Sequence, residues 1–256
     1  MQTEPFDRVV AYTPEAANSG SIWKFKIEWH NENFRSSVMS WLTLFCLVVL
    51  YPVASIFGVD DPAALLENLD NELRMILFLS TIVVQWLIFS VIFAASYVES
   101  TGLAGLGFKR LRLIDFFWAA AFFGAAMLIL SGLAELLAFL GMPMPGEIKF
   151  LIPEDRSGRI VWVFLSLTAG ICEETAFRGY LMSRLRLLGG FNSWVIPTIV
   201  SALVFGACHA YQGIPGFIVI SVYGAMFSLL FIYTRSIWPC IIAHFFQDFM
   251  ALFIPQ

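Results

Sequence analysis

Residues 171–178 have the sequence I-C-E-E-T-A-F-R and close an apolar run that begins at Ile160. A charged side chain at the centre of a bilayer costs roughly 2.5–3.5 kcal/mol on insertion scales, so such groups face a protein interior or a wet cavity. On a helix, Glu174 and Arg178 lie four residues apart with the acid first, an order that favours an ion pair. Glu173 points about 100° away from Glu174 and cannot share that arginine equally. The stretch therefore predicts one glutamate that is neutralised by its neighbour and one that is left free.

The composition of the whole chain is that of an integral membrane protein. Of its 256 residues, 59% are hydrophobic and 13% are charged, and the mean hydropathy is +0.79. Soluble domains are nearer one half hydrophobic and one quarter charged. We therefore expect the lipid bilayer as its surroundings, a cell (plasma) membrane location, and no nucleic acid among its partners. The four cysteines all fall in apolar runs without metal-ligand spacing, which indicates small buried side chains.

Seven apolar runs follow a polar start, and most approach the ~20 residues that a spanning helix needs. They lie at about 38–58, 75–98, 114–140, 160–182, 194–211, 215–234 and 237–254, the fifth and seventh being the shortest. The pattern predicts an all-α polytopic membrane bundle of about seven transmembrane helices, or eight if one half-spanning segment is added. We divide the chain into an N-terminal cytoplasmic extension (1–37), N-terminal transmembrane helices (38–157) and catalytic helices (158–256). Within the extension, residues 22–29 alternate apolar and charged, which suits a short strand or an interfacial segment.

Basic residues between the runs indicate the orientation. With the N-terminus in the cytoplasm, eleven Lys and Arg lie in inner segments and four in outer ones. The inner residues are Arg8, Lys24, Lys26, Arg35, Lys109, Arg110, Arg112, Arg178, Arg184, Arg186 and Arg235, and the outer ones are Arg74, Lys149, Arg156 and Arg159. Positive charge is enriched on the cytoplasmic side of membrane proteins. This bias predicts an odd number of spans, with the C-terminus outside.

Few ionisable groups remain at membrane depth once the loops are set aside. They are Glu135, Glu173, Glu174, Arg178, His209, His244 and Asp248. We expect Glu135 to be partly hydrated near the outer interface, and Asp115 to lie at the start of its run near the other interface. Phe205 and His209 are four residues apart, as are His244 and Asp248, so each pair shares one helix face. Two histidines, an aspartate and an unpaired glutamate in the last 85 residues favour a functional cluster.

A glutamate with two histidines suits hydrolysis. Glu173 would take a proton from a water that attacks a carbonyl, while His209 or His244 holds the water or the developing oxyanion. The same groups suit zinc equally well, because two histidines, a carboxylate and a water form a common catalytic shell. Spacing does not choose between these two mechanisms. Cys172 or Cys208 as a nucleophile is less favoured, because each points 100° away from the neighbouring reactive residue and lacks an orienting group.

Small residues predict that the helices approach one another closely around this cluster. They are Ala169-Gly170, Gly179, Gly206-Ala207 and Gly224-Ala225. Small side chains at helix interfaces let backbones come near in a membrane. We therefore expect the sixth run, which carries Gly224, to border the cluster although it holds no reactive group.

Three motifs in this order resemble the CPBP (CAAX protease and bacteriocin-processing, or Abi) family, which is related to the type II CAAX prenyl endopeptidase. They are E-E-x-x-x-R at Glu173–Arg178, F-x-x-x-H at Phe205–His209 and H-x-x-x-D at His244–Asp248, within residues 158–254. The resemblance implies an intramembrane endopeptidase acting on a peptide or protein substrate. In it, Glu173 activates water, His209 assists, and His244 with position 248 stabilises the oxyanion.

One residue departs from the prenyl protease, which typically has asparagine where this chain has Asp248. An anion stabilises an oxyanion poorly, so the aspartate favours an orienting role for His244 or a zinc ligand set of Glu173, His209, His244 and Asp248. Between the two mechanisms, the family resemblance favours the one without metal, and we commit to no cofactor. Two other functions stay open: a non-catalytic protein that binds a peptide or partner, as in bacteriocin immunity, and a proton-coupled carrier. The carrier is the less favoured, because the first three runs offer no polar path beyond Glu135.

Overall fold

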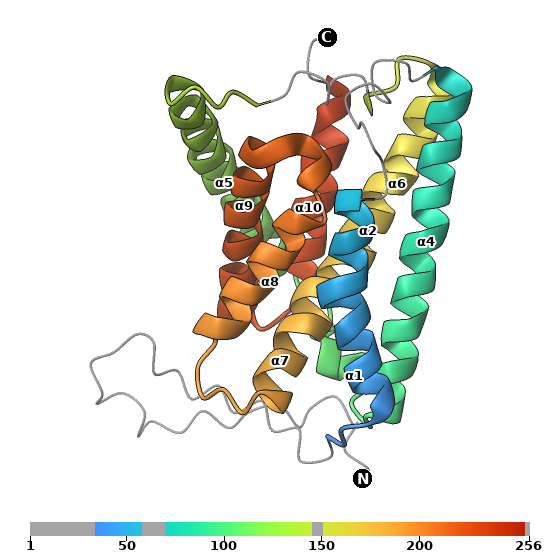
Figure 1. Cartoon of the computed structure of the whole chain (residues 1–256), viewed down its shortest axis with the longest axis vertical. Coiled ribbons are helices and arrows are strands. Elements are labelled where there is room, and N and C mark those ends of the chain that lie inside the picture. The colour runs from blue at the N-terminus through green and yellow to red at the C-terminus, as the bar shows by residue number, and fades with distance from the viewer. Residues whose placement is uncertain (1–33, 58–69, 145–150, 254–256) are drawn as a thin grey trace.

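The computed structural model describes residues 34–57, 70–144 and 151–253, and all regular secondary structure in these ranges is helical (Figure 1). The prediction of an all-α bundle is confirmed. The expected extension lies outside the described residues except for its last four positions, and the alternating segment 22–29 lies outside them altogether.

The apolar runs form helices close to their expected bounds. The first is continuous through α1 (Val38–Phe45), the π-helical turn η2 (Cys46–Leu50) and α2 (Tyr51–Phe57). Next come α4 (Asn71–Val98), α5 (Leu113–Phe139), and a long helix formed by α6 (Arg156–Glu174), the π-helical η5 (Thr175–Met182) and α7 (Ser183–Leu188). The last three are α8 (Val195–Ala207), α9 (Gly213–Thr234) and α10 (Trp238–Met250). Short 3₁₀ turns η3 (Ala104–Leu106), η6 (Ala210–Gln212) and η7 (Ala251–Phe253) lie between or after them.

Five helical segments in the described ranges are long and apolar enough to cross a membrane, and two more, Val195–Ala207 and Trp238–Phe253, are apolar but shorter. These two are the fifth and seventh runs, as expected. Successive segments alternate in direction through the bundle (Figure 1). Seven segments are present, and the described residues hold no eighth helix. The chain is thus an integral membrane protein.

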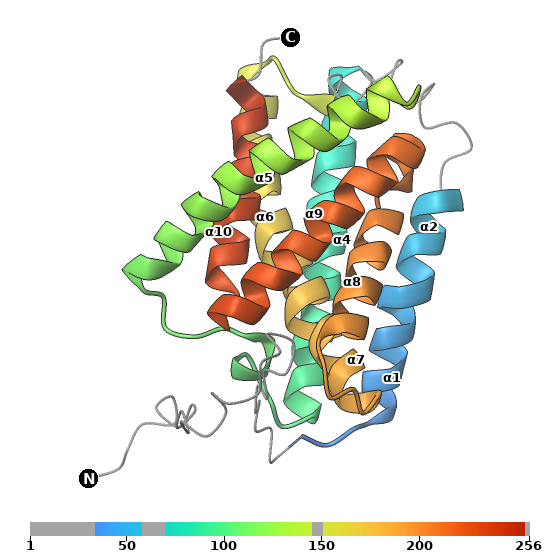
Figure 2. The same cartoon turned by 90° about the vertical axis from the view of Figure 1, so that its left-hand side faces the viewer.

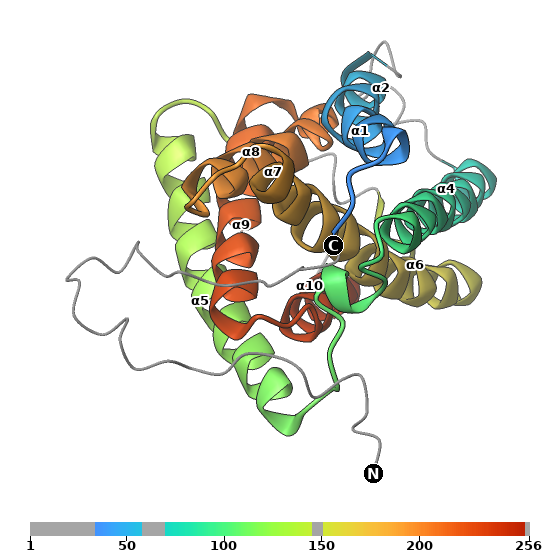
Figure 3. The same ribbon diagram turned by 90° about the horizontal axis from the view of Figure 1, so that it is seen from below.

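The long α6–α7 helix is the central element. Seen from below, it runs through the middle of the bundle, with α1 and α4 on one side and α9 and α10 on the other (Figure 3). Its first turn is capped by Asp155, whose side chain accepts from the Gly158 N–H at 2.8 Å. Two buried apolar clusters flank it, and one joins Leu47 and Ile92 from the first helices to Phe177 and Phe205. The two predicted groups of helices therefore share a core.

Two glycines allow the close approach that the small residues predicted. A β-carbon on Gly170 of α6 would lie 2.9 Å from the Ile241 carbonyl oxygen of α10. A β-carbon on Gly206 of α8 would lie 2.8 Å from the Phe217 carbonyl oxygen of α9. Real β-carbons do not tolerate such distances to backbone atoms, so α6 against α10 and α8 against α9 require glycine there.

Helix α10 begins partway up the bundle, above the lower end of α7 (Figure 2). The linker before α5 holds it there: the Ile237 N–H donates to the Gly107 carbonyl at 3.0 Å, and the Trp238 indole donates to the Lys109 carbonyl at 2.6 Å. Sequence alone places His244 only about 10 Å along its run and His209 about 22 Å along its own, at 1.5 Å per residue. The raised start of α10 closes this gap.

Our list of intramembrane charges missed a second buried cluster. Arg184, which we assigned to an inner loop segment, is fully buried and donates to Glu99 at 2.7 and 2.9 Å. The Tyr180 hydroxyl donates to the other Glu99 oxygen at 2.9 Å. We placed Arg184 in a loop because the fourth apolar run was expected to end at residue 182. In the structure, the helix that begins as α6 continues through η5 and α7, and Arg184 packs against the linker between α4 and α5. Removing Arg178 and Arg184 from the eleven inner cations leaves nine against four, so the bias persists.

Three other residues can now be placed in detail. Asp115 lies in the first turn of α5, as expected, where it is fully buried by protein and accepts from the Arg112 N–H at 2.8 Å. Glu135 is exposed on α5. Cys46 is exposed on the outer face of the first helix, whereas the other three cysteines are buried as expected.

Candidate active site

Glu174 and Arg178 form the ion pair that their spacing predicted. Arg178 Nη1 lies 2.9 Å from Glu174 Oε1, and both side chains are fully buried. The guanidinium also donates to the Gly224 carbonyl at 3.1 Å, and its carbon lies 4.3 Å from the centre of the Phe205 ring. A β-carbon on Gly224 would lie 3.3 Å from Arg178 Nη2. The sixth run therefore borders the cluster, as expected.

Glu174 has a second partner that the sequence did not indicate. His244 Nδ1 of α10 lies 2.8 Å from the same oxygen, Glu174 Oε1. A carboxylate only accepts, so Nδ1 carries the hydrogen and Nε2 is turned to the opposite side of the ring. The imidazole stacks on Phe227, with 5.5 Å between ring centroids. Glu174 thus holds the Nδ1 side of the His244 ring.

Glu173 is held by a residue outside the three motifs. Its Oε1 accepts from Gln85 Nε2 of α4 at 2.6 Å. Its Oε2 has no hydrogen-bond partner among the described residues and lies 4.0 Å from His244 Nε2. The side chain is 12% exposed. We expected Glu173 to be left free, and the structure instead gives it one hydrogen bond, from Gln85. Gln85 was missed, although it is a polar residue within an apolar run.

The side chains of His244 and Asp248 lie next to each other on one face of α10, as their spacing predicted. His244 Nε2 lies 3.6 Å from Asp248 Oδ2, whose side chain is about one third exposed. Asp248 is anchored through its backbone, because its carbonyl accepts from the Trp162 indole of α6 at 2.9 Å. His244 Nε2 therefore faces two carboxylates, Glu173 and Asp248, on the side away from Glu174.

His209 lies just beyond the end of α8, where we expected the helix to continue to residue 211. The helix ends at Ala207, and Nδ1 of His209 bonds the Phe205 carbonyl at 2.9 Å. Because a carbonyl only accepts, Nδ1 carries the hydrogen, and Nε2 of the neutral ring is an acceptor. The rings of His209 and His244 lie 4.9 and 6.3 Å from that of Phe205. His209 also interacts electrostatically with His244 and Asp248.

The structure thus brings together Glu173, Glu174, Arg178, His244 and Asp248 directly, with His209 joined to them through Phe205. Tyr51 of α2 and Tyr211 of η6 interact electrostatically with Glu173 on another side. Cys172 and Cys208 are also electrostatic neighbours of Glu173, but no hydrogen bond joins either one to a histidine in the described part of the chain. This geometry gives no support to a cysteine nucleophile.

A metal was the alternative use of these residues. Among the described residues, no group of three or more His, Cys, Asp and Glu side chains is arranged to hold a metal ion. His244 Nδ1 and His209 Nδ1 are engaged by Glu174 and by the Phe205 carbonyl, so only their Nε2 atoms are open to ligands. The zinc ligand set therefore stays a prediction, and we derive no step through a metal.

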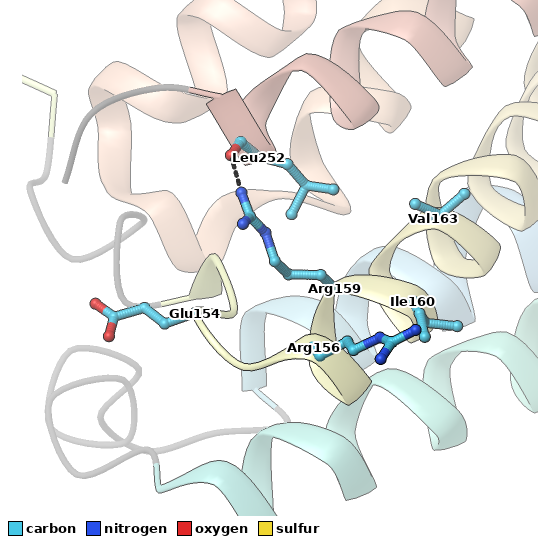
Figure 4. Close-up of a pocket in the computed structure, with 6 residues that line it drawn as sticks. All are labelled: Glu154, Arg156, Arg159, Ile160, Val163 and Leu252. Atoms are coloured by element: carbon cyan, nitrogen blue, oxygen red, sulfur yellow. Dashed lines mark hydrogen bonds between the residues drawn. The ribbon is translucent and has the colours of Figure 1, made fainter.

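A separate hollow of about 360 Å³ lies at the other end of α6 (Figure 4). Glu154, Arg156, Arg159, Ile160, Val163 and Leu252 line it. Arg159 donates to the Leu252 carbonyl at 2.7 Å, which ties α6 to the turn after α10. None of the motif residues takes part, so this hollow is not the candidate active site.

Taken together, a membrane helix bundle encloses a carboxylate and two histidines on three helical segments, the set of groups that an intramembrane hydrolase requires. Comparison with known families agrees: the family model for type II CAAX prenyl endopeptidase Rce1-like proteins matches residues 156–250. The matched residues are similar to an Rce1-like domain, which is consistent with the CPBP family. No curated protein and no solved structure matches the chain.

Proposed function

We propose that this chain is an intramembrane endopeptidase in which Glu173 activates the water that attacks a peptide carbonyl. The observation that carries the proposal is the division of labour between the two adjacent glutamates. Glu174 is engaged by Arg178 and His244 through one oxygen. Each glutamate keeps an Oε2 without a hydrogen-bond partner among the described residues, but only that of Glu173 faces His244 Nε2, at 4.0 Å. The Glu173 side chain is 12% exposed, whereas the Glu174 side chain is fully buried. A base needs an oxygen that is free to accept a hydrogen bond from a water.

In the proposed reaction, Glu173 Oε2 takes a proton as the water oxygen bonds to the carbonyl carbon. As the tetrahedral intermediate collapses and the C–N bond breaks, Glu173 delivers that proton to the leaving amine nitrogen, so that a carboxylic acid and an amine form with no net gain or loss of protons. His244 Nε2 faces the same space, and when it carries a proton it donates to the developing oxyanion. Glu174 supports this role by holding the imidazole through Nδ1.

His209 is proposed to hold the attacking water. Its Nδ1 is committed to the Phe205 carbonyl, so Nε2 of the neutral ring accepts a hydrogen from that water. Asp248 lies 3.6 Å from His244 Nε2 and is partly exposed. We propose that it keeps His244 correctly placed and does not contact the oxyanion.

The test is turnover of a fluorogenic peptide by the purified protein in lipid vesicles. Glu173→Gln keeps the shape and removes the base, so it should abolish turnover without lowering thermal stability. His209→Ala and His244→Ala should each lower kcat by about 10²-fold or more with little change in KM, because their help is greatest in the transition state. The double variant should be little worse than the worse single one, since groups acting as a unit are not additive.

Three outcomes would contradict the proposal. Full-rate cleavage after replacement of both histidines would end it. Loss of activity with a strong chelator and recovery with zinc would replace the metal-free mechanism by the metal alternative. A protein that binds the peptide tightly but never cleaves it would instead support the non-catalytic binder.

A further inference from the structure

Among the described residues, the only hydrogen bond to the Glu173 side chain comes from Gln85, which lies outside the region that the family model matches. It lies near the middle of α4, on a helix whose neighbouring residues face lipid, yet it is only 5% exposed. Helices α4 and α6 begin at the same end of the bundle and run side by side (Figure 1). Gln85 lies about 21 Å along α4 and Glu173 about 26 Å along α6 at 1.5 Å per residue, so the two reach a similar depth.

The hydrogen bond between Gln85 and Glu173 is short, and only Gln85 can be its donor. Gln85 Nε2 lies 2.6 Å from Glu173 Oε1. A carboxylate only accepts, so the amide nitrogen must face it, and hydrogen bonds to ionised groups are shorter than neutral ones. No other described residue donates to either Glu173 oxygen, and the amide oxygen of Gln85 has no hydrogen-bond partner among those residues.

This bond distinguishes the two oxygens of the carboxylate. With Oε1 held by α4, Oε2 is the oxygen without a hydrogen-bond partner among the described residues, and it is the one that faces His244 Nε2. A reacting group must be held within about 0.5 Å and 10–20° of its productive geometry. A glutamate side chain with three rotatable bonds needs a second anchor to meet that demand.

We propose that Gln85 is a positioning residue, whose amide holds Glu173 Oε1 so that Oε2 is the oxygen that takes the proton from water. The role rests on the proposed function, because it concerns the same base. It makes the active site incomplete without α4, a helix that precedes the matched domain.

A simpler reading is that Gln85 only fastens α4 to α6, since polar side chains often join helices in membranes. The neighbouring residue supplies a matched control. The Trp86 indole donates to Thr168 Oγ1 of α6 at 3.2 Å, which is a second α4–α6 hydrogen bond. Trp86→Phe removes a bond between the same two helices without touching Glu173.

The first experiment measures kcat and KM of Gln85→Met, which keeps side-chain length and removes the donor. We expect kcat to fall on the order of 10²-fold, because a small misplacement of a reacting group lowers the rate by about that factor. KM should stay within about twofold of the wild-type value. Trp86→Phe should stay within about twofold of the wild type in both. Unchanged kcat in Gln85→Met, or an equal loss in Trp86→Phe, would overturn the inference. If Gln85→Met does not fold, Gln85→Leu takes its place in this experiment and in the infrared measurement.

The second experiment does not need activity. The infrared carboxylate band of Glu173, identified as the one lost in Glu173→Gln, should shift in Gln85→Met and stay unmoved in Trp86→Phe. An unmoved band in Gln85→Met would overturn the inference even if the enzyme is active. A wild-type protein that never cleaves peptide would end the proposed function, while the band would still show whether Gln85 holds Glu173.

Discussion

At the scale of single residues, one oxygen of Glu174 serves two helices. Its Oε1 accepts from Arg178 within the same helix and from His244 of α10. Phe205 fills the space between them, with the Arg178 guanidinium carbon 4.3 Å from its ring centre and both imidazoles beside it. Stability and chemistry therefore depend on the same carboxylate.

Glu174→Gln should lower both stability and activity. It leaves the Arg178 cation buried without an opposite charge, and breaking a buried pair in this way typically costs about 3–5 kcal/mol. It also weakens the bond that orients His244. Thermal unfolding in detergent and kcat would show the two losses together.

Arg110→Gln is the control for that change, because Arg110 is exposed on the linker between α4 and α5. Removing a surface charge away from buried pairs usually changes stability by less than about 0.5 kcal/mol, so this variant should behave like the wild type. A Glu174→Gln protein that is as stable as Arg110→Gln and yet inactive would show that Glu174 shares the role assigned to Glu173.

At the scale of elements, the site depends on how closely α6 meets α10. Gly170 lies one turn before Glu174, and the backbone of α10 passes beside it at Ile241, one turn before His244. Beyond Glu174 the helix widens into the π-helical η5, a feature that frequently marks functional sites in helices. The distance between Glu173 and His244 is therefore set by backbone contact.

Gly170→Ala should push the two helices apart. The new β-carbon would lie 2.9 Å from the Ile241 carbonyl oxygen and 3.3 Å from the Phe245 nitrogen, neither of which can move as a flexible side chain would. Overpacking of this kind costs about 1–3 kcal/mol, and we expect a large loss of kcat as well. Gly132→Ala on α5 is the matched control, since its β-carbon would meet nothing within 4 Å. Equal behaviour of the two variants would contradict the packing account.

At the scale of the whole molecule, helices from both halves of the chain build one site. Gln85 comes from α4, Tyr51 from α2, and the reactive groups from α6, α10 and the end of α8. The offset start of α10 and the buried Glu99–Arg184 pair both depend on the linker between α4 and α5. The N-terminal helices are thus part of the architecture that supports the chemistry.

The orientation in the membrane remains a prediction that two surface positions can test. Asn192, between α7 and α8, should face the cytoplasm, and Ser157, at the start of α6, should face outside. In a cysteine-free background, an impermeant thiol reagent added to intact cells should label Ser157→Cys at once. It should label Asn192→Cys only after permeabilisation, because the membrane separates the two. The reverse pattern would contradict the predicted orientation.

Relations within one helix were predictable from the sequence. The Glu174–Arg178 pair, the Phe205–His209 contact and the His244–Asp248 pair all follow from residues four apart, because helical geometry repeats every 3.6 residues. The number and order of the apolar segments followed from hydropathy in the same way. Small residues indicated close approach without saying which helices would meet.

Relations between helices were decided only by the tertiary structure. Nothing in the apolar run of α4 showed that Gln85 would face Glu173, or that His244 would bond Glu174. The Glu99–Arg184 pair joins residues 85 positions apart, and we had placed its arginine in a loop. Hydropathy is nearly the same for a helix face that meets lipid and one that meets another helix. The rotation and depth of each helix are therefore set by contacts that no single run contains, and these contacts give the two adjacent glutamates different partners.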